Sequence, residues 1–261
     1  MRLVSLNMNG IRAATKKGVW DWLAEAEVDV LCLQETRIQA AQLTPALGPP
    51  DGFQSYHLHA TRPGYSSVAI MSQREPDALH EGLGWEPFDA EGRLLRADFG
   101  DLSVVSLYMP SGSSKDERQL FKEDCMRRVA EWMDALREER PHVVVCGDWN
   151  IAHTEKDIKN ARANRNNSGF LPQEREWMTE LLEQRQWTDV FRSLDADAEA
   201  EGYTWWSNRG NAFANNVGWR IDYQIASQAF AAKAKRSWVM REPRFSDHAP
   251  LFVDYQWPFK A

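Results

Sequence analysis

The sequence predicts an α/β protein in which two mixed β-sheets pack face to face with helices outside. Short apolar runs recur along the whole 261-residue chain and outnumber the helix-like segments. Several runs are joined by short turns, and helix-like segments separate others. No repeat, low-complexity tract or Pro/Gly-rich linker interrupts the sequence. We therefore expect a single domain over residues 1–261.

Runs rich in Val, Leu and Ile are typical of buried strands. They span residues 2–7, 29–34, 53–58, 66–72, 93–99, 102–109, 142–147, 219–226, 234–240 and 250–256. Gly100-Asp101, between the fifth and sixth runs, predicts a tight hairpin.

Three other segments have helical features. Residues 20–27 follow Gly18, and residues 115–139 carry apolar side chains at helical spacing. Residues 172–185 begin with Pro172 and have acidic residues in the first turn, which is typical of a helix N-terminus.

Composition excludes several classes of protein. Hydrophobic residues make up 43% and charged residues 26%, which is ordinary for a globular chain. No apolar run approaches the length of a membrane span, so we expect no membrane association. Cys32 and Cys146 lie inside apolar runs, and Cys125 leaves the number odd, which favours reduced thiols. The first residues are already strand-like, so we expect no secretory leader and a cytoplasmic location.

A net charge of −7 does not at first suggest a nucleic-acid-binding protein, but the charges are unevenly distributed. Residues 204–248 contain seven Lys or Arg against three acids, and residues 156–165 contain four against one. Most such side chains in proteins are solvated surface charges. Together, however, they predict one basic face on an acidic protein.

Polar residues follow or precede many of the predicted strands. The set is Asn7, Asn9, Glu35, Asp148, Asn150, Asp222, Asp247 and His248. Taken singly, each has a simpler explanation as a cap, a turn residue or a structural histidine. Because strand ends drawn from the whole chain can meet at one rim of a sheet, the set predicts a site that holds a hard metal ion and activates water.

Hydrolysis of a phosphodiester needs these residue types. Glu35 offers hard oxygen for Mg²⁺, and Asp148 can orient and deprotonate the attacking water. His248 can donate a hydrogen bond to a phosphate oxygen, while Asp222 holds its ring as the cation. Asn7 and the amide at position 150 can bind phosphate without adding negative charge. No Cys/His zinc spacing or Walker-type glycine loop occurs, which disfavours zinc and nucleoside triphosphates.

The motifs around these residues extend over nearly the whole chain. They comprise residues 7–12 (NMNGIR), 33–36 (LQET), Tyr108 before Met109-Pro110, 147–152 (GDWNIA), 167–170 (NSGF), 216–223 (NVGWRIDY) and 246–248 (SDH). In these motifs the chain resembles the exonuclease III family of apurinic/apyrimidinic (AP) endonucleases, within the wider endonuclease/exonuclease/phosphatase superfamily.

The resemblance implies a four-layer α/β sandwich and a DNA repair nuclease. It implies Mg²⁺-dependent hydrolysis, with Mn²⁺ as a possible substitute, of the phosphodiester 5′ to abasic sites. It also implies 3′–5′ exonuclease activity and cleaning of blocked 3′ ends. The expected partner is double-stranded DNA carrying abasic sites or blocked 3′ ends. The expected protein is a monomer, associated with the nucleoid if its source is a bacterium.

The resemblance also assigns roles to residues. Catalytic roles fall to Tyr108, Asp148, Asn150, Asp222 and His248, and the metal site comprises Glu35 as main ligand with Asn7, Asp148, Asn150, Asp247 and His248. A pocket for the flipped-out sugar comprises Trp205, Trp219 and Ile221, and DNA contacts fall to Asn9, Arg12, Lys115, Asn167, Arg209 and Arg220. Arg37 stands where many members carry Lys, at a position that we expect to lie outside the chemistry.

Two alternatives remain open. Residues 243–251 also resemble a bacterial catabolite-repression regulator on the same fold, which would be a catalytically silent RNA- or DNA-binding protein. Such a regulator needs no catalytic acids, whereas Glu35, Asp148 and Asp247 are all present here. A phosphatase or phospholipase of the same superfamily would share those acids but need not share the tryptophan pocket or the basic segments.

Overall fold

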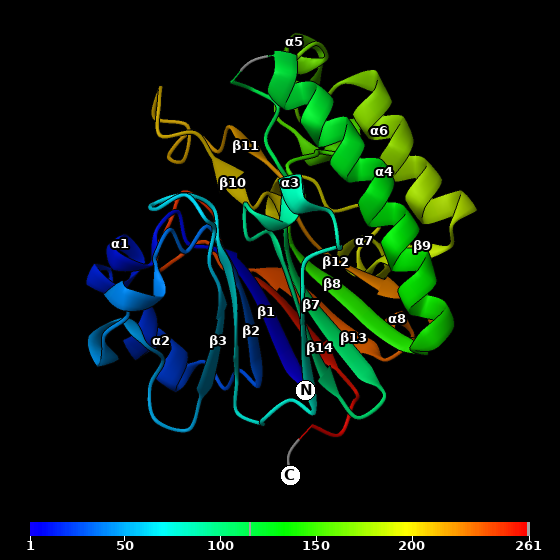
Figure 1. Ribbon diagram of the computed structural model, residues 1–261. Helices are drawn as coiled ribbons and strands as arrows, with labels where there is room; N and C mark the ends of the chain where they lie inside the picture. Colours follow the sequence, from blue (N-terminus) through cyan, green and yellow to red (C-terminus); the bar gives the residue numbers. More distant parts are fainter. Residues whose placement is uncertain (115, 260–261) are drawn as a thin grey trace.

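Two six-stranded sheets form the centre of the protein in a computed structural model that describes residues 1–114 and 116–259 (Figure 1). The first sheet has the strand order β13-β14-β1-β2-β4-β3. Its strands are β13 (Ala234–Val239), β14 (Leu251–Tyr255), β1 (Arg2–Asn7), β2 (Val30–Gln34), β4 (Val68–Ser72) and β3 (Gln54–Leu58). Only β1 and β2 are parallel neighbours in it, so this sheet is mixed.

The second sheet has the order β5-β6-β7-β8-β12-β9, and only β7 and β8 are parallel neighbours in it. Its strands are β5 (Ala78–Glu81), β6 (Leu94–Phe99), β7 (Leu102–Tyr108), β8 (His142–Asp148), β12 (Asp222–Ser227) and β9 (Trp187–Asp189). A short ribbon pairs β10 (Trp205–Trp206) with β11 (Gly218–Trp219).

The helices are mostly short and lie outside the sheets. They are α1 (Ile11–Lys16), α2 (Val19–Glu25), α3 (Glu86–Asp89), α4 (Asp116–Glu139), α5 (Ala161–Asn164), α6 (Pro172–Thr179), α7 (Val190–Leu194) and α8 (Gln228–Ala231). Single turns of 3-10 helix occur at Ala40–Gln42, Pro45–Leu47, Glu155–Asp157 and Ala200–Gly202, and a π-helical turn spans Glu180–Gln184. Among the described residues, no helix combines the length and apolar character that a membrane crossing requires.

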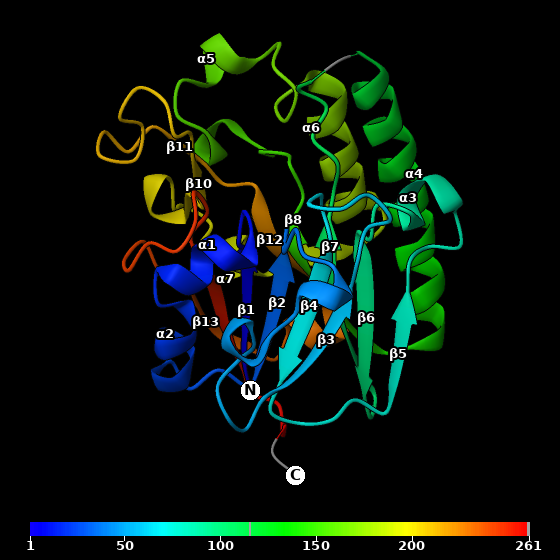
Figure 2. The same ribbon diagram turned by 60° about the vertical axis from the view of Figure 1, so that its left-hand side comes forward.

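The central strands are apolar throughout because both of their faces are buried. In β8, Val144 and Cys146 point into the core between the two sheets, whereas Val143 and Val145 pack beneath α4. In β1, Leu3 points into the core between the sheets and Val4 packs with α1 and α2. Figures 1 and 2 show the resulting order of helix, sheet, sheet and helix. The predicted four-layer α/β sandwich is confirmed.

Most predicted elements are present, and the differences have local causes. The hairpin at Gly100-Asp101 joins β6 to β7 as predicted. The run 219–226 is not one strand, because Arg220 and Ile221 separate β11 from β12. β5, β9 and β10 are strands that the sequence did not predict. Each has only two to four residues, too few to show an alternating pattern.

The topology brings the polar strand ends to one rim. β1, β2, β7 and β8 end there, since each parallel pair runs toward the same edge. β12 and β14 run antiparallel to β8 and β1, so they begin at that rim. Asn7 and Asp148 therefore lie at strand ends, whereas Asp222 and His248 lie at or just before strand starts.

Candidate active site

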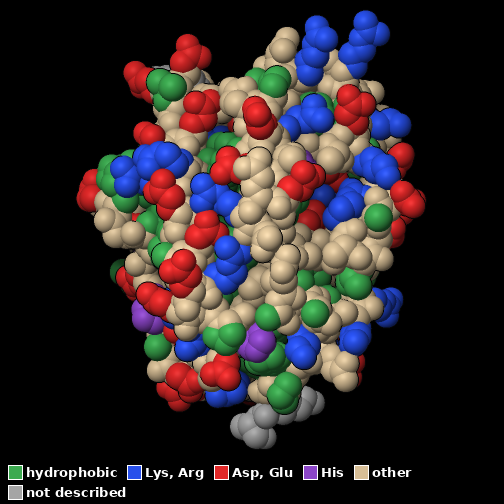
Figure 3. All heavy atoms as spheres, turned by 90° about the vertical axis from the view of Figure 1, so that its right-hand side faces the viewer, with side chains coloured by type: hydrophobic (Ala, Val, Ile, Leu, Met, Phe, Trp, Pro, Cys, Tyr) green, Lys and Arg blue, Asp and Glu red, His purple; other side chains and the backbone are tan. Residues whose placement is uncertain are grey.

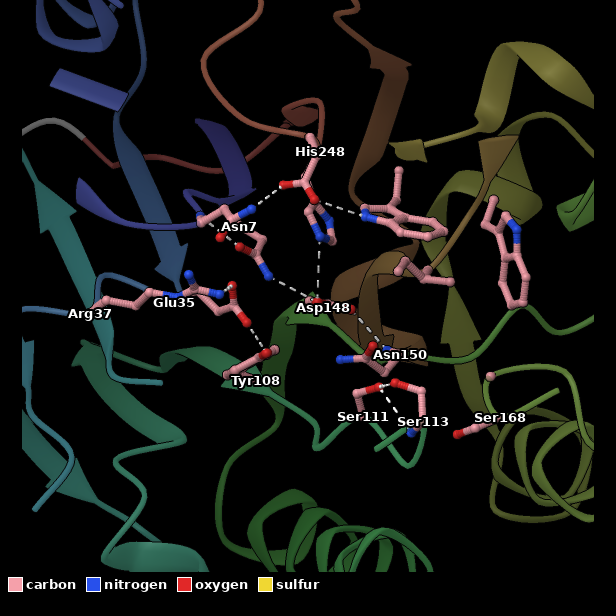
Figure 4. A pocket seen from close by; sticks show the side chains of 16 residues that line it. Asn7, Glu35, Arg37, Tyr108, Ser111, Ser113, Asp148, Asn150, Ser168 and His248 are labelled. Carbon is pink, nitrogen blue, oxygen red and sulfur yellow. Dashed lines mark hydrogen bonds and ion pairs between the residues drawn. The ribbon is translucent and has the colours of Figure 1, made fainter. Parts of the chain in front are cut away.

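A pocket of about 280 Å³ opens at this rim, between the ends of the two sheets (Figure 4). It contains every residue predicted for the metal site or the sugar pocket, and of the predicted catalytic residues only Asp222 is absent from its lining. The lining residues are Asn7, Asn9, Glu35, Arg37, Tyr108, Ser111, Ser113, Asp148, Asn150, Ser168, Gly169, Trp205, Trp219, Ile221, Asp247 and His248.

Asp148 lies at the centre of the pocket and is buried. Its Oδ2 accepts a hydrogen bond of 2.9 Å from Asn7 Nδ2, and its Oδ1 accepts one of 2.9 Å from the Asn150 amide. Burial raises the pKa of Asp148 to about 7, and the Asp222 and Glu35 carboxylates add to this shift while His248 opposes it. A carboxylate with such a pKa can accept a proton near neutral pH.

His248 is held by carboxylates. Its Nδ1 lies 2.9 Å from Asp222 Oδ2, and its Nε2 lies 3.8 Å from Asp148 Oδ2. Burial alone would lower the pKa of His248, but Asp222 and Asp148 outweigh it and raise the pKa to about 10. The imidazole is therefore a cation at neutral pH, as the sequence predicted.

Glu35 directly follows β2, and its carboxylate makes a hydrogen bond with one side chain and an ion pair with another. It accepts a hydrogen bond from the Tyr108 hydroxyl, and its Oε2 lies 2.8 Å from Arg37 Nη2. Burial, with the nearby Glu35 charge, raises the pKa of Tyr108 well above its usual range, so the phenol remains a donor. Arg37 was expected to lie outside the chemistry. That expectation was wrong, because the forked guanidinium of Arg37 reaches back to the Glu35 carboxylate.

Asp247 is hydrogen-bonded to two other residues that line the pocket. Its Oδ1 accepts from Asn9 Nδ2 at 2.8 Å, and its Oδ2 accepts from the Trp205 indole at 3.2 Å. Burial opposes ionisation of Asp247, but His248 and these hydrogen bonds hold its pKa below the usual value. Asp247 is therefore an anion in the pocket at neutral pH.

Aromatic side chains wall one side of the pocket. The rings of Trp205 and Trp219 meet edge to face, with centroids 5.9 Å apart, and Ile221 packs beside them. Both tryptophans are only partly buried, whereas Trp206 next to them is in the core. The two tryptophans thus present apolar surface to the pocket.

Four of the residues that line the pocket have an unusual backbone conformation. Asn9, Glu35, Arg37 and Asn150 all have positive φ angles, between 46° and 53°, in the left-handed region that non-glycine residues seldom adopt. Such conformations cluster at functional sites, where the surrounding structure enforces them. Here all four residues lie within three residues of the end of β1, β2 or β8, and all four line the pocket.

The residues predicted to contact DNA lie in different environments. Asn9 lines the pocket, and Arg12, Asn167 and Arg209 are exposed outside it. Lys115 lies outside the described residues. Arg220 was predicted wrongly, because it is buried and its guanidinium lies 2.7 Å from Asp157 and 2.8 Å from Asp189. Arg220 follows Trp219 directly, and its ion pairs fix this part of the chain to Asp157 and Asp189. Its buried guanidinium cannot reach DNA.

The basic segments do not form one face as predicted. Lys233, Lys235 and Arg236 lie at the start of β13, where Ala234 pairs with Tyr255, far from the rim. Arg244 lies at the rim, where it lines a second, smaller cavity with Lys17 and Asp247. On the α4 face, acidic and basic side chains are intermixed, and Lys or Arg side chains protrude at the upper edge (Figure 3).

Sequence reasoning missed part of the lining. Ser111, Ser113 and Ser168 come from loops that follow β7 and precede α6, and Figure 4 shows them below Asn150. Serines in loops have no periodicity and no distinctive spacing, so only the quoted 167–170 motif pointed toward Ser168.

Residues 4–248 match the endonuclease/exonuclease/phosphatase family. The chain belongs to that family. Among relatives of this family, an exodeoxyribonuclease of Bacillus subtilis (strain 168) is 37% identical over 252 residues, covering 96% of this chain and 98% of that protein. An AP endonuclease structure from Archaeoglobus fulgidus superposes with a TM-score of 0.89 at 27% identity, covering 98% and 100% of the two chains.

A 3′ phosphatase from Neisseria, bound to a product DNA hairpin, superposes with a TM-score of 0.90, again at 27% identity and 98% and 100% coverage. The resemblance to exonuclease III-type AP endonucleases is therefore confirmed. The family member described here is a hydrolase acting on DNA phosphodiester bonds.

The donor atoms of the pocket suit a hard divalent cation. The lining residues within the described ranges offer carboxylate, amide and hydroxyl oxygens but no thiolate. A second possible group, Asp148, Asp222 and His248, has donor atoms within 4.8 Å of one another. That group suits a metal less well, because His248 is a cation whose Nδ1 is engaged by Asp222. Glu35 and its neighbours fit better.

Proposed function

We propose that this protein is a DNA repair nuclease that incises the strand 5′ to abasic sites and also removes nucleotides and blocking groups from 3′ ends. The observation that carries the proposal is a buried Asp148, joined to Asn7 and His248, beside a wall of Trp205 and Trp219. Asp148 can activate water, and the two tryptophans suit a small, partly apolar sugar.

In this proposal, Asp148 orients the attacking water and takes its proton. Its raised pKa lets it accept that proton near neutral pH. Asn150 donates its backbone N–H to Asp148 Oδ1, which keeps the carboxylate aimed into the pocket. The lone pair that receives the proton is thereby kept in position.

His248 donates a hydrogen bond to a non-bridging phosphate oxygen, and its positive charge offsets the charge that develops there. Asp222 keeps it protonated. In this proposal Tyr108, whose raised pKa keeps the phenol protonated, contacts the phosphate or stabilises the leaving oxygen. Each of these donors is fixed before substrate arrives.

A divalent cation belongs to the same proposal. Glu35, with Asn7 and Asp247 nearby and Asp148 and Asn150 around it, would hold Mg²⁺, for which Mn²⁺ would substitute. His248 also lines the pocket, but as a cation it is not a metal ligand in this proposal. When bound, the ion neutralises phosphate charge and stabilises the leaving oxygen. The carboxylate and amide oxygens, with no thiolate in the described lining, support Mg²⁺ over a thiophilic metal.

The pocket supports damage specificity by exclusion. Trp205, Trp219 and Ile221 line one part of the pocket. In this proposal a sugar without a base fits against them, whereas a nucleotide with a base clashes. Extrusion from the stack also costs least where the base is missing. We further propose that residues 1–261 act as one monomeric domain in the cytoplasm, near the nucleoid of a bacterium.

The alternatives lack support from the site. A silent nucleic-acid-binding regulator has no use for a strained, hydrogen-bonded set of acids, and Glu35, Asp148, Asp222 and Asp247 are all in place. A phosphatase or phospholipase does not need the aromatic wall.

The test is incubation with a duplex carrying one abasic analogue, with Mg²⁺ and with EDTA. Incision should require the metal, and Glu35→Ala should fold normally yet lose most activity at ordinary Mg²⁺. Full incision in EDTA would contradict the metal requirement. Equal cleavage of a matched undamaged duplex would contradict the abasic specificity.

A further inference from the structure

An ion pair that the proposed chemistry does not use lies directly behind the pocket. Lys122 of α4 and Glu174 of α6 face each other with Nζ and Oε1 2.5 Å apart, and both side chains are fully buried. Neither residue lines the pocket. The pair nevertheless contacts the backbone of two segments that do.

On one side, Lys122 Nζ donates to the Asn150 carbonyl at 2.8 Å. On the other, Glu174 Oε2 accepts from the Gly169 amide at 2.6 Å and from the Leu171 amide at 3.0 Å. The pair thus joins the residue that follows Asp148-Trp149 to the loop that precedes α6. Both segments contribute to the pocket lining.

These segments have little room to move. A Cβ on Gly169 would lie 3.0 Å from the Asn150 carbonyl oxygen and 3.1 Å from the Trp219 ring. Gly169 also accepts a hydrogen bond from the Ala152 amide at 2.8 Å. A shift of this loop therefore displaces either the backbone beside Asp148 or the aromatic wall.

Stability alone does not account for such a pair. Two buried charges lose their hydration, and well-packed apolar side chains of similar volume often stabilise a fold at least as well. What an apolar pair cannot do is donate to the Asn150 carbonyl, whose residue is held at φ 53°. The charged groups of Lys122 and Glu174 therefore hold the backbone of Asn150 and Gly169 in place.

We propose that Lys122 and Glu174 are positioning residues for catalysis, which hold Asn150 and Gly169 at the spacing that the reaction requires. This inference rests on the proposed nuclease function. Lys122 acts through Asn150, whose backbone N–H donates to the Asp148 carboxylate and orients it. Glu174 acts through the loop that contains Gly169, which packs against Trp219. Misplacement here alters the geometry of reaction more than the affinity for DNA.

The experiment compares Glu174→Gln with the double variant K122M/E174Q. Gln at position 174 still accepts a backbone N–H at the start of α6, as a capping-box residue does. In Glu174→Gln, Lys122 keeps its donor to Asn150; in the double variant that donor is replaced by an apolar chain of similar length. Met126→Leu, one turn along α4 and buried, controls for repacking of the helix.

Relative to Glu174→Gln, the double variant should lose on the order of tenfold to a hundredfold in kcat, the scale expected for a small misplacement. Its KM for abasic duplex should stay within about twofold, as befits a transition-state effect. Its melting temperature should not fall. Met126→Leu should have the kcat of the wild type.

Equal kcat values in the two folded variants would overturn the inference. A fall in kcat that matches a fall in folded fraction would overturn it as well. Failure of the wild type and Met126→Leu to incise abasic duplex would instead contradict the proposed function, so the two failures are distinguishable.

If the double variant does not fold, hydrogen exchange in the wild-type protein decides the question. An amide that donates to a buried carboxylate should be as protected as the amides of β8. A Gly169 amide that exchanges like an exposed loop would overturn the inference.

Discussion

Asn7 Nδ2 lies 2.9 Å from Asp148 Oδ2, so a hydrogen bond connects the end of β1 in one sheet to the end of β8 in the other. The two residues are 141 positions apart in the sequence. The carboxylate that we propose as the proton acceptor is thus held by a neutral amide, which adds no charge beside it.

Asp148→Asn should preserve DNA binding and reduce the rate of incision at least about a hundredfold, the usual scale for a positioned general base. The amide keeps the shape of the carboxylate but cannot accept the proton of water. Single-turnover incision and fluorescence anisotropy on the same abasic duplex check both parts. A variant that cleaves at nearly the wild-type rate would show that another group activates the water.

The pH dependence follows from Asp148 and His248. Asp148 acts when ionised, so incision should rise with pH through about 7. His248 acts as the cation, so incision should fall as pH rises through about 10. In Asp222→Asn the partner that favours the imidazolium is lost, so the pKa of His248 falls and the alkaline limb moves toward neutral pH. Profiles of kcat for both proteins test this, and an unmoved alkaline limb would contradict it.

Arg37 competes for the carboxylate that we propose as the main metal ligand. The Arg37 side chain in its ion pair with Glu35 is 43% exposed. Exposed ion pairs contribute about 0.2–1 kcal/mol to the free energy of the state in which they form. Arg37→Ala should therefore lower the Mg²⁺ concentration for half-maximal incision by about 1.4- to 5-fold. Lys16→Ala, an exposed cation on α1, serves as the control for net charge. An Mg²⁺ requirement that rises in Arg37→Ala would mean that Arg37 supports the site.

Trp219→Ala should relax damage selectivity. With the pocket opened, incision at abasic sites should fall while cleavage beside intact nucleotides holds or rises. The ratio of the two rates on matched duplexes is the measurement. Trp238→Ala removes a partly buried tryptophan that stacks on Phe252, away from the pocket, and should leave the ratio unchanged. If Trp219→Ala lowers both rates equally, the residue serves packing alone.

Binding to duplex DNA should weaken steeply with salt despite the net charge of −7, through the cations at the rim. Lys17→Ala with Arg244→Ala removes two of these cations. The slope of log affinity against log salt should then fall by about 0.9 for each phosphate that is no longer neutralised. Lys233→Ala with Lys235→Ala removes the same charge at the far end of β13 and should leave the slope unchanged. Equal slopes in all three proteins would contradict a contribution from the rim.

The rim could be predicted because strand ends are marked in the sequence by a change from Val and Leu to Asn, Glu or Asp. Asn7, Glu35 and Asp148 follow that rule, whereas His248 comes just before β14, and all four converge in the structure. Arg220 shows where the rule fails. It follows Trp219 in a basic segment, but its partners, Asp157 and Asp189, are distant in sequence and become visible only in the fold. Arg37 was misjudged for a different reason: its partner Glu35 is only two residues away, and nothing in the sequence marks the positive φ at Arg37.

The division of the site between two sheets also affects when the protein becomes active. Asn7 and Glu35 come from the first 35 residues, whereas Asp222 and His248 come from the last 40. A chain still being synthesised, or one in which the sheets have not docked, holds no complete set. The residues that we propose for catalysis therefore come together only when the last strand has been added and the two sheets have docked.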